Sequence, residues 1–407
     1  MVLPAPSVLF TAFEPSGDDH AAAVIAELRR RHPSLPIYAW GGPKMERAGA
    51  TLVQRTGDDA VVGMPGVEDV RRFLRTYRAI ELWMRGARPT VHVPVDSPAA
   101  NIHIAKLAKR NGAKVVHLVA PQLWAWGPWR IRTLRKRTDH VLCLLPFEEA
   151  WFEVRGVPAT FVGHPLFDEP LDLQALDEEA AARTLPQGAQ RLAILPGSRA
   201  KELRRNFPVM LEAFRELRRR HPDLVGVIGA TTEEVRDRLR AKAEELGGWP
   251  DGLEILAGRT DLIVRWSTVA VAVSGTVTLQ IAKQLRPMVV MYKINKLQWN
   301  AFGKRLIMTR FISLPNLIAG RPVISELFPY FKGHERLVEA VDALVSDPAA
   351  REAQRRGLLE VCERFAGRTA STRSADVIEE ISGARRAAAA GRSADRRAAV
   401  GGERIVE

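Results

Sequence analysis

Short runs of apolar, β-branched residues alternate with longer amphipathic stretches along the first half of the chain. The apolar runs at 8–12, 90–95, 114–119 and 140–144 predict strands, and the periodic stretches at 19–31 and 99–110 predict helices. Such alternation is typical of βαβ units, in which helices cover both faces of a parallel sheet. We therefore expect a doubly wound α/β domain over residues 1–168.

The same alternation restarts after an acidic stretch at 169–190, which we interpret as a linker. A second doubly wound domain is expected over 191–365. Its strands are predicted at 191–195, 224–228, 253–256, 269–273 and 287–291, and its helices at 207–220 and 276–284. A last helix is predicted at 369–382. Residues 383–407 are rich in Arg, Ala and Gly, with too few large apolar side chains to offset the entropy of ordering, so we expect disorder there.

Composition narrows the class of partner. The 407 residues include 60 Lys and Arg against 47 Asp and Glu, a net charge of +13. That excess predicts an anionic partner, whether nucleic acid, membrane surface or phosphorylated substrate.

The two cysteines lie far apart, which argues against a disulfide framework or a cysteine zinc site and fits a reducing cytoplasm. The histidines show no metal-ligand spacing, so no metal and no other cofactor is expected. The first residues lack the pattern of a signal peptide, and the longest uncharged stretches are too short to span a bilayer.

Two motifs of the first half follow predicted strands. Residues 14–18 read EPSGD, and 95–98 read VDSP. Ligands of doubly wound sheets bind at the carboxyl ends of strands, where Asp96 is placed to act as a general base. Both motifs are equally compatible with simple helix caps. Residues 14–18 do not fit the dinucleotide fingerprint, so a nicotinamide cofactor is not supported.

Two motifs of the second half favour a diphosphate. Residues 195–199 (LPGSR) lead a strand into a glycine loop that ends in a guanidinium. Residues 273–276 (VSGT) lead a strand into a helix whose N–H groups attract anions. Each alone is compatible with an ordinary turn, but two such turns in one domain indicate a nucleotide diphosphate. A Walker lysine motif is absent from the sequence.

Residues 71–88 carry six Arg and one Glu around an apolar stripe, made of Phe73, Leu74, Tyr77, Ile80 and Met84, with Trp83 beside it. A basic amphipathic helix of this kind either lies on an anionic membrane or buries its stripe in the core.

Three tryptophans at 124, 126 and 129 are too close together for all to be core, and a nucleic-acid stacking platform is a minor alternative. His164 lies at the expected domain junction and either lines a cleft or satisfies a turn.

Taken in order, these segments resemble the lipid-A-disaccharide synthase family. The matching segments cover most of residues 7–330: ExSGD (14–18), GGPKMERAG (41–49), VGMPGVEDV (62–70), VDSP (95–98), PxxWAW (121–126), LCLLPFE (142–148), FVGHPLFD (161–168), ILPGSR (194–199), SGTVTL (274–279), PMVVMYK (287–293) and SLPNLIAGRPVISEL (313–327).

The resemblance implies a GT-B fold, in which two Rossmann-like doubly wound domains face a cleft and the last helix, at 366–382, crosses back to the first domain. It implies inverting transfer of 2,3-diacylglucosamine from its UDP derivative to 2,3-diacylglucosamine 1-phosphate, giving a β-1,6 disaccharide and UDP. Asp96 is implied as the catalytic base. The implied substrate-binding residues are Glu14, Ser16, Gly17, Asp18, Trp124, His164 and Asn316, and the implied UDP-binding residues are Gly197, Ser198, Arg199, Ser274, Gly275, Thr276 and Gln280. The family usually has glutamate at the position of Gln280, whose amide can still bond ribose hydroxyls.

Because both substrates are acylated, the resemblance favours the membrane interpretation of 71–88, and with it a cytoplasmic protein at the inner face of the cytoplasmic membrane. We expect no nucleic-acid partner, and a monomer or homodimer. Two alternatives stay open at this point: an isomerase like UDP-N-acetylglucosamine 2-epimerase, or a related transferase with another lipid acceptor. A third class, a non-catalytic protein that binds RNA or membrane, would show no affinity for UDP.

Overall fold

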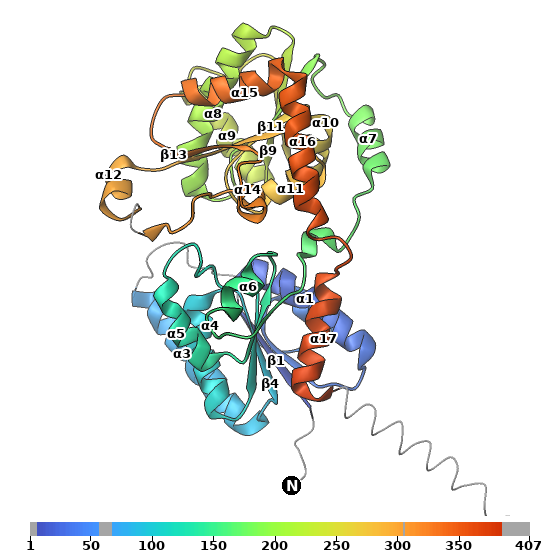
Figure 1. Ribbon diagram of the computed structural model, residues 1–407, viewed down its shortest axis with the longest axis vertical. Coiled ribbons are helices and arrows are strands. Elements are labelled where there is room, and N and C mark those ends of the chain that lie inside the picture. Colours follow the sequence, from blue (N-terminus) through green and yellow to red (C-terminus); the bar gives the residue numbers. More distant parts are fainter. Residues whose placement is uncertain (1–5, 57–66, 304–305, 385–407) are drawn as a thin grey trace, which may run out of the picture. The chain divides into compact units, whose positions relative to one another are not determined.

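The chain forms two compact units, each built on one parallel sheet (Figure 1). A computed structural model describes residues 6–56, 67–303 and 306–384. Unit 1 contains the residues up to Asp168 and those from Gly367 onward, and unit 2 contains Glu169–Ala366. The VGMPGVEDV segment lies partly, and the tail expected to be disordered almost wholly, outside the described residues.

The sheet of unit 1 has seven parallel strands in the order β3-β2-β1-β4-β5-β6-β7. They are β1 (Val8–Ala12), β2 (Ile37–Gly41), β3 (Thr51–Arg55), β4 (Val91–Val95), β5 (Lys114–Leu118), β6 (His140–Cys143) and β7 (Ala159–Phe161). The central strands β1 and β4 are buried at every position, and their sequences are apolar except for Thr11 and His92. All four strands expected here are confirmed to within one residue at each end. β2, β3 and β7 were not predicted. β3 is a half-exposed edge strand with polar residues, and β7 has only three residues.

Helices cover both faces of this sheet (Figure 1). They are α1 (Pro15–Arg31), α2 (Pro43–Arg47), α3 (Val67–Ala87), α4 (Pro98–Arg110), α5 (Ile131–Arg137), α6 (Glu148–Glu153) and α17 (Ala370–Ser382), with short turns η1 (Pro128–Arg130) and η2 (Pro165–Phe167). α1 and α4 begin earlier than predicted, at prolines in their first turns, where proline's missing N–H is not needed.

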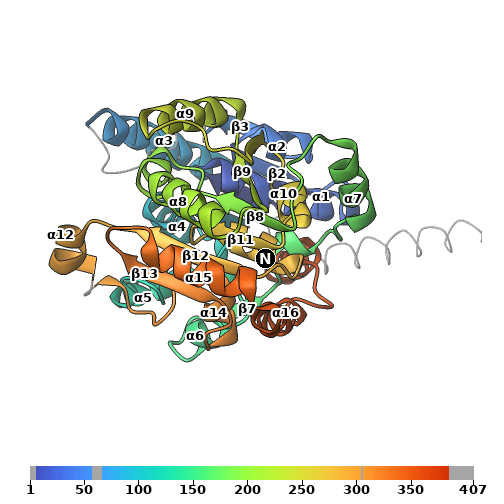
Figure 2. The same cartoon turned by 90° about the horizontal axis from the view of Figure 1, so that it is seen from above.

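The sheet of unit 2 has six parallel strands in the order β10-β9-β8-β11-β12-β13, most of which can be followed from above in Figure 2. They are β8 (Gln190–Leu195), β9 (Leu224–Ala230), β10 (Leu253–Ala257), β11 (Val269–Ala272), β12 (Met288–Lys293) and β13 (Ser325–Tyr330). The five strands predicted for this domain are confirmed, and β13 was not predicted. The helices are α8 (Ala200–Arg220), α9 (Glu233–Glu245), α10 (Thr260–Trp266), α11 (Val277–Lys283), α12 (Lys296–Gln298), α14 (Leu314–Ala319), α15 (Glu335–Ser346) and α16 (Pro348–Glu363), with the π-helical turn η3 (Trp299–Gly303).

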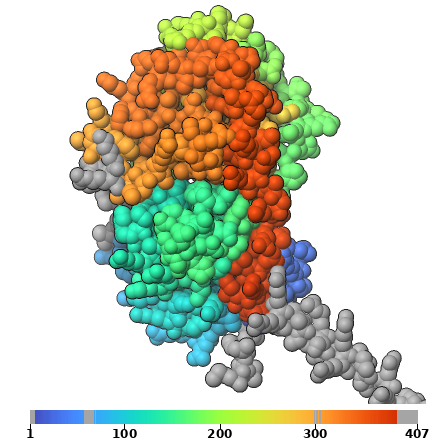
Figure 3. All heavy atoms as spheres, viewed as in Figure 1, coloured from blue at the N-terminus to red at the C-terminus, as the bar shows by residue number. Residues whose placement is uncertain are grey.

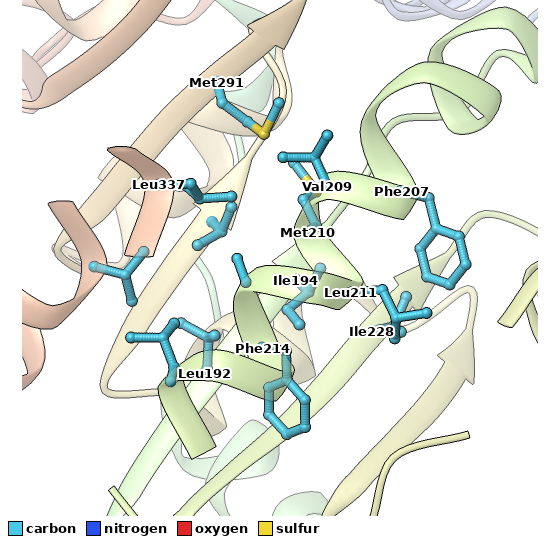
Figure 4. Close-up of a cluster of buried hydrophobic side chains, with 14 of the residues drawn as sticks. Leu192, Ile194, Phe207, Val209, Met210, Leu211, Phe214, Ile228, Met291 and Leu337 are labelled. Carbon is cyan, nitrogen blue, oxygen red and sulfur yellow. The ribbon is translucent and has the colours of Figure 1, made fainter. Parts of the chain in front are cut away.

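The core of unit 2 forms where α8 packs on its sheet (Figure 4). Phe207, Met210 and Phe214 of α8 are buried against Leu192 and Ile194 of β8. These helix residues recur at intervals of three and four, which places them on one face. α8 begins seven residues before the predicted start, because its polar first turns carry no apolar periodicity.

The acidic stretch expected to be a linker is structured. It contains α7 (Leu173–Ala182), which packs against α10. The carboxylate of Asp177 on α7 accepts two hydrogen bonds from Arg265 on α10, at 2.6 and 2.7 Å. Residues 169–190 therefore belong to unit 2 rather than to a free connection.

The last helix, α17, packs against α1 in unit 1. Arg31 at the end of α1 donates to Asp376 and Glu379 of α17 at 2.8 and 3.1 Å. The carboxylate of Asp168 accepts from the backbone N–H of Ala370 at 2.7 Å, at the first turn of α17. The chain thus leaves unit 1 after Asp168 and returns to the same residue about 200 positions later.

The basic helix predicted at 71–88 is α3, and only part of its apolar stripe is available to a partner. Ile80 and Met84 are fully buried in the core, and Trp83 packs edge-on against Tyr38 and Trp40. The interpretation of the whole stripe as a lipid-facing surface is therefore wrong. Among the side chains of α3 that the structure describes, the large apolar ones that are exposed are Val70, Leu74 and Leu82. Within the described residues, no helix is both long and apolar enough to cross a bilayer.

Candidate active site

Asp96 lies in a strained turn where β4 ends. Its φ is +47°, and that of the next residue, Ser97, is +43°. Two consecutive non-glycine residues in the left-handed region are unfavourable by about 1–3 kcal/mol each, and such strain is concentrated at functional sites. Val119 at the end of the neighbouring strand β5 also has a positive φ, of +67°. The Asp96 side chain is only partly buried, so its carboxylate is open to a reactant.

Asn101 holds this turn in place. Its side-chain amide donates to the carbonyls of Val95 and Asp96, at 2.9 and 2.8 Å. The Asn101 carbonyl accepts from the hydroxyl of Thr11 at 2.7 Å. Because that hydroxyl has already given its one proton, it accepts from Nε2 of His92, which lies 2.9 Å away. His92, Thr11 and Asn101 thus form a buried chain of hydrogen bonds that ends on the backbone of Asp96.

The first turn of α1 closes over the other side of Asp96. The Ser97 hydroxyl donates to Glu14 at 2.8 Å, and the Ser16 hydroxyl approaches the Asp96 carboxylate at 3.5 Å. A side chain at Gly17 would lie 3.0 Å from Cβ of Ala12, so this glycine permits the close approach of helix and sheet. The structure therefore brings Glu14, Ser16, Gly17 and Asp96 together.

His20 lies on α1 one turn after Ser16, and the ring of His164 is its neighbour. Burial lowers the pKa of His20, although the carboxylates of Asp96 and Asp19 oppose the shift. Burial also lowers the pKa of His164 to about 4, helped by His20, whose ring is 6.5 Å away. Both imidazoles are therefore neutral at pH 7. Nδ1 of His164 accepts from the backbone N–H of Leu166 at 3.2 Å, so this side chain caps the turn η2.

The side chain of Asp18 binds backbone groups of the protein itself. Its buried carboxylate accepts from the backbone N–H groups of Gly42, Lys44 and Met45, at 3.0–3.2 Å. Asp18 thus satisfies the free N–H groups at the start of α2, which explains why EPSGD and GGPKM occur together in one chain. A Cβ at Gly42 would lie 2.4 Å from the Asp18 carboxylate, so only glycine fits.

Gly42→Ala is expected to lower the stability of unit 1 by about 2 kcal/mol, because the added methyl group must displace a carboxylate that binds three N–H groups. Gly86→Ala is the matched control, since a Cβ there has nothing within 4 Å and the residue lies in α3. That control should be neutral or slightly stabilising. Thermal unfolding of both variants tests the difference, and equal melting temperatures would contradict the assigned role of Asp18.

Trp124 is buried rather than presented to solvent. It is 8% exposed, its Nε1 donates to Glu148 at 2.9 Å, and its ring packs edge-on against Phe147. Burial raises the pKa of Glu148 to about 7, with the Trp124 and backbone hydrogen bonds opposing the shift. Trp126 and Trp129 are 48% and 64% exposed, as expected for tryptophans that are not all core. Trp124 thus anchors the loop after β5 to Glu148 and Phe147.

The glycine loop of unit 2 presents an exposed guanidinium. Gly197 has a φ of +110°, and a Cβ there would lie 2.8 Å from the Glu202 carboxylate, so the turn requires glycine. Ser198 and Arg199 are exposed at the start of α8, whose first N–H groups receive no side-chain cap. Arg199 pairs with Glu202 at 3.2 Å, and its side chain is 64% exposed. This pair is weak enough for an incoming diphosphate to replace it.

The Ser274–Thr276 turn follows the neighbouring strand β11. The Ser274 hydroxyl donates to the carbonyl of Ile312 at 2.6 Å, which anchors the turn. Gly275 and Thr276 are exposed, and Gln280 is half-buried on α11. Gly275 has no positive φ, and a Cβ added to it would have nothing within 4 Å, so the folded chain itself does not require glycine there. Close approach of a ligand is a reason for glycine that the fold does not supply.

Asn316 is fully engaged inside unit 2. Its amide donates to the carbonyl of Ile324 and to Glu326, and its carbonyl accepts from the N–H groups of Val323 and Ile324. These four bonds use the whole capacity of an asparagine side chain. Glu326 also accepts from the N–H groups of Ile312 and Ser313, each at 3.0 Å. Asn316 therefore shapes the loop that carries Ile312, the partner of Ser274, rather than offering a polar group to a substrate.

Sequence reasoning missed the residues that position the site: Thr11, His92, Asn101, Glu148 and Glu326. The sequence does carry one signal for such residues, which is a polar residue inside an apolar strand, such as Thr11 or His92. A residue in that position is buried, and buried polar groups are nearly always hydrogen-bonded. Among the described residues, no group of three His, Cys, Asp or Glu side chains is arranged to hold a metal ion. Unit 1 thus carries an accessible carboxylate suited to deprotonate a hydroxyl, and unit 2 carries groups suited to a diphosphate.

Comparison of the sequence with those of known proteins points to a single family. The family model described as Lipid-A-disaccharide synthetase matches residues 8–374. The lipid-A-disaccharide synthase of Geobacter sulfurreducens is 32% identical over 381 residues, covering 92% of this chain and 97% of the relative. That of Anaeromyxobacter dehalogenans is 36% identical over 355 residues, covering 87% and 92%.

Solved structures share the fold at low identity. A co-structure of S. aureus MnaA with UDP aligns with a TM-score of 0.60 and 10% identity, covering 92% of this chain and 96% of that one. The glycotransferase of kitacinnamycin aligns with a TM-score of 0.58 and 17% identity, covering 93% and 100%. These likenesses support two Rossmann-like domains and no particular reaction. The sequence matches, which span nearly the whole chain and its ordered motifs, show that the chain belongs to the lipid-A-disaccharide synthase family.

Proposed function

We propose that the protein transfers 2,3-diacylglucosamine from its UDP derivative to the 6-hydroxyl of 2,3-diacylglucosamine 1-phosphate, with Asp96 as the base. Membership of the family carries the reaction class. The strained, hydrogen-bonded and accessible turn at Asp96 supports the assignment of the base. The epimerases share only the fold with this chain, so the isomerase alternative has no support from sequence.

The step balances with the groups present. Asp96 accepts the proton of the acceptor hydroxyl while that oxygen forms a bond to C1 of the donor sugar. The bond from C1 to the diphosphate oxygen breaks on the opposite face, which inverts the configuration, and UDP leaves with the electron pair. Arg199 and the N–H groups at the start of α8 are proposed to stabilise the charge that develops on that diphosphate.

The remaining site residues follow from the contacts described above. We propose that Glu14, Ser16 and Gly17 border the acceptor, since they close over Asp96. Ser198, Gly275, Thr276 and Gln280 are proposed to contact UDP directly. Asp18, Trp124, His164, Gly197, Ser274 and Asn316 are proposed to shape these surfaces through the backbone that they hold.

The test is an assay with both acylated substrates in detergent micelles and EDTA, following UDP release and lipid mass. We expect disaccharide and UDP in equal amounts, without added metal. Incubation of the donor alone is expected to leave its sugar unchanged. An epimerised sugar, or UDP binding without a disaccharide product, would overturn the proposed reaction.

Gly275→Ala is expected to weaken UDP binding by roughly tenfold without lowering stability, because the new methyl group meets a ligand and no protein atom. Gly197→Ala is the matched control, and should lower the melting temperature even without UDP. Isothermal titration with UDP and thermal unfolding of both variants measure the two effects. Unchanged UDP affinity in Gly275→Ala would remove this turn from the binding site.

A further inference from the structure

An arginine is stacked on a tryptophan in the loop that follows β5. The guanidinium carbon of Arg130 lies 3.9 Å from the ring centre of Trp126, and Nη2 donates to the Trp126 carbonyl at 3.2 Å. Gly127, whose φ is +75°, leaves room for this pair, because a Cβ there would lie 2.8 Å from Nε of Arg130. Figure 3 shows teal atoms of this part of the chain at the surface of unit 1. The loop therefore holds a half-buried guanidinium in one defined position.

This loop leaves the sheet beside the turn of Asp96. The backbone N–H of Asp96 donates to the carbonyl of Leu118, the last residue of β5, at 3.0 Å. Since β4 and β5 are neighbouring parallel strands, the turn and the loop start at the same edge of the sheet. Trp124 anchors the loop to α6, because its Nε1 donates to Glu148 at 2.9 Å. Arg130 thus lies at the edge of unit 1 where ligands of such sheets bind, together with the proposed base.

Arg130 has no negative charge to balance its own. Within the described residues its guanidinium donates a single hydrogen bond, to Trp126, and Nε is buried without a hydrogen-bond partner. Burial lowers the pKa of Arg130, and no carboxylate in that part of the chain counters the shift. The sequence from Ser97 to Thr138 contains no acidic residue. Because a partly desolvated cation without a counter-ion is unfavourable, this group is suited to an anion that arrives from outside.

A second pair with the same spacing shows which of these features are unusual. Arg155 lies 4.1 Å from the ring centre of Trp151 and donates to its carbonyl at 2.9 Å, so the two pairs have the same local geometry. Arg155 is exposed, however, and it lies between the acidic helix α6 and the start of β7. Burial, the lack of acidic neighbours in the chain and the position beside Asp96 therefore distinguish Arg130 from an arginine that merely stacks.

We propose that Arg130 binds the phosphate group of the acceptor, a sugar phosphomonoester. The proposal rests on the proposed function, which gives the acceptor a 1-phosphate and places that substrate next to Asp96. A guanidinium suits this role because two of its N–H groups can bind two phosphate oxygens at once. Trp126 and Gly127 hold Arg130 in place before the ligand arrives, so binding does not have to order a long side chain.

The test compares two acceptors in detergent micelles with the UDP donor: 2,3-diacylglucosamine 1-phosphate and the same lipid without its phosphate. In Arg130→Ala, KM for the phosphorylated acceptor should rise about 20-fold, because a charge-assisted contact is lost. KM for the acceptor without phosphate should match that of the parent. Arg130→Lys keeps the charge but loses the planar fork, so KM for the phosphorylated acceptor should rise about fivefold. UDP affinity and melting temperature should stay at the parent values in both variants.

Arg155→Ala is the matched control, since it removes an arginine stacked on a tryptophan in the same way. It should change KM for neither acceptor. Binding is also measured without turnover, by isothermal titration with glucosamine 1-phosphate, inorganic phosphate and glucosamine. We expect glucosamine 1-phosphate to bind more tightly than the other two probes. Its affinity should fall about tenfold in Arg130→Ala and stay unchanged in Arg155→Ala.

An unchanged KM for the phosphorylated acceptor in Arg130→Ala would overturn the proposal. An equal rise in KM for both acceptors would also overturn it, because Arg130 would then only brace the loop. Inorganic phosphate that binds as tightly as glucosamine 1-phosphate would contradict the assignment to a sugar phosphate, and a loss of UDP affinity would move Arg130 to the donor. A parent that binds glucosamine 1-phosphate through Arg130 but forms no disaccharide would instead contradict the proposed function and leave this site standing.

Discussion

Replacing Asp96 with asparagine should lower kcat by about a thousandfold, because general-base catalysis contributes about 10²–10⁴ to enzymatic rates. Asparagine has the same shape but accepts no proton at neutral pH. It also tolerates the left-handed backbone that this position requires, where φ is +47°. The turn is held through the backbone carbonyl of Asp96, which asparagine retains. The folded state should therefore be unchanged, and the loss should appear in the chemical step alone.

Three measurements separate this result from a general defect. UDP affinity and melting temperature should match those of the parent, while single-turnover disaccharide formation falls. Asp19→Asn is the control, since Asp19 is an exposed carboxylate near the same site that pairs with Lys44. Its activity should stay within a factor of about two. If Asp96→Asn retains activity near that of the parent, the base lies elsewhere, and neutral His20 is the next residue to replace.

Asn101→Ala should have the second largest effect, on both stability and rate. The substitution removes a buried hydrogen bond from each of the carbonyls of Val95 and Asp96 and from the hydroxyl of Thr11. The lost hydrogen bonds and the cavity together predict a loss of about 2–4 kcal/mol in the free energy of unfolding. Release of the turn displaces the Asp96 carboxylate, and a shift of about 1 Å lowers rates by roughly a hundredfold.

The control for Asn101→Ala is Leu107→Ala on the same helix, α4. Leu107 is 3% exposed, and its truncation should be destabilising by a similar amount, about 2–5 kcal/mol, without touching the turn. Below both melting temperatures, Leu107→Ala should retain the parent kcat, and Asn101→Ala should not. Asn101→Asp keeps the shape but points an acceptor at two carbonyls, so it too should lose activity. Equal kcat in the alanine variants would reduce Asn101 to a purely structural residue.

The order of motifs along the chain was enough to predict the reaction class. Nine strands were predicted from apolar runs alone, because strands buried on both faces of a parallel sheet need continuous apolar sequence. The strands that were missed are short or lie at or near a sheet edge, where β3 is exposed and β7 has three residues. β3 and β7 form because a neighbour supplies hydrogen bonds, and that support leaves no pattern in their own residues.

The features of the site also fall into those that the sequence predicted and those that only the tertiary structure revealed. The sequence by itself determined the parallel α/β architecture, the family, and the placement of Asp96, Arg199 and Ser274–Thr276 after strands, since those features depend on local pattern and residue order. Only the tertiary structure decided that Asp18, Trp124 and Asn316 direct their polar groups into the protein, that Ile80 and Met84 face the core, and that Asn101 holds the turn of Asp96. Those roles depend on which hydrogen-bond partners lie within about 3 Å in space, and residues distant in sequence supply most of them.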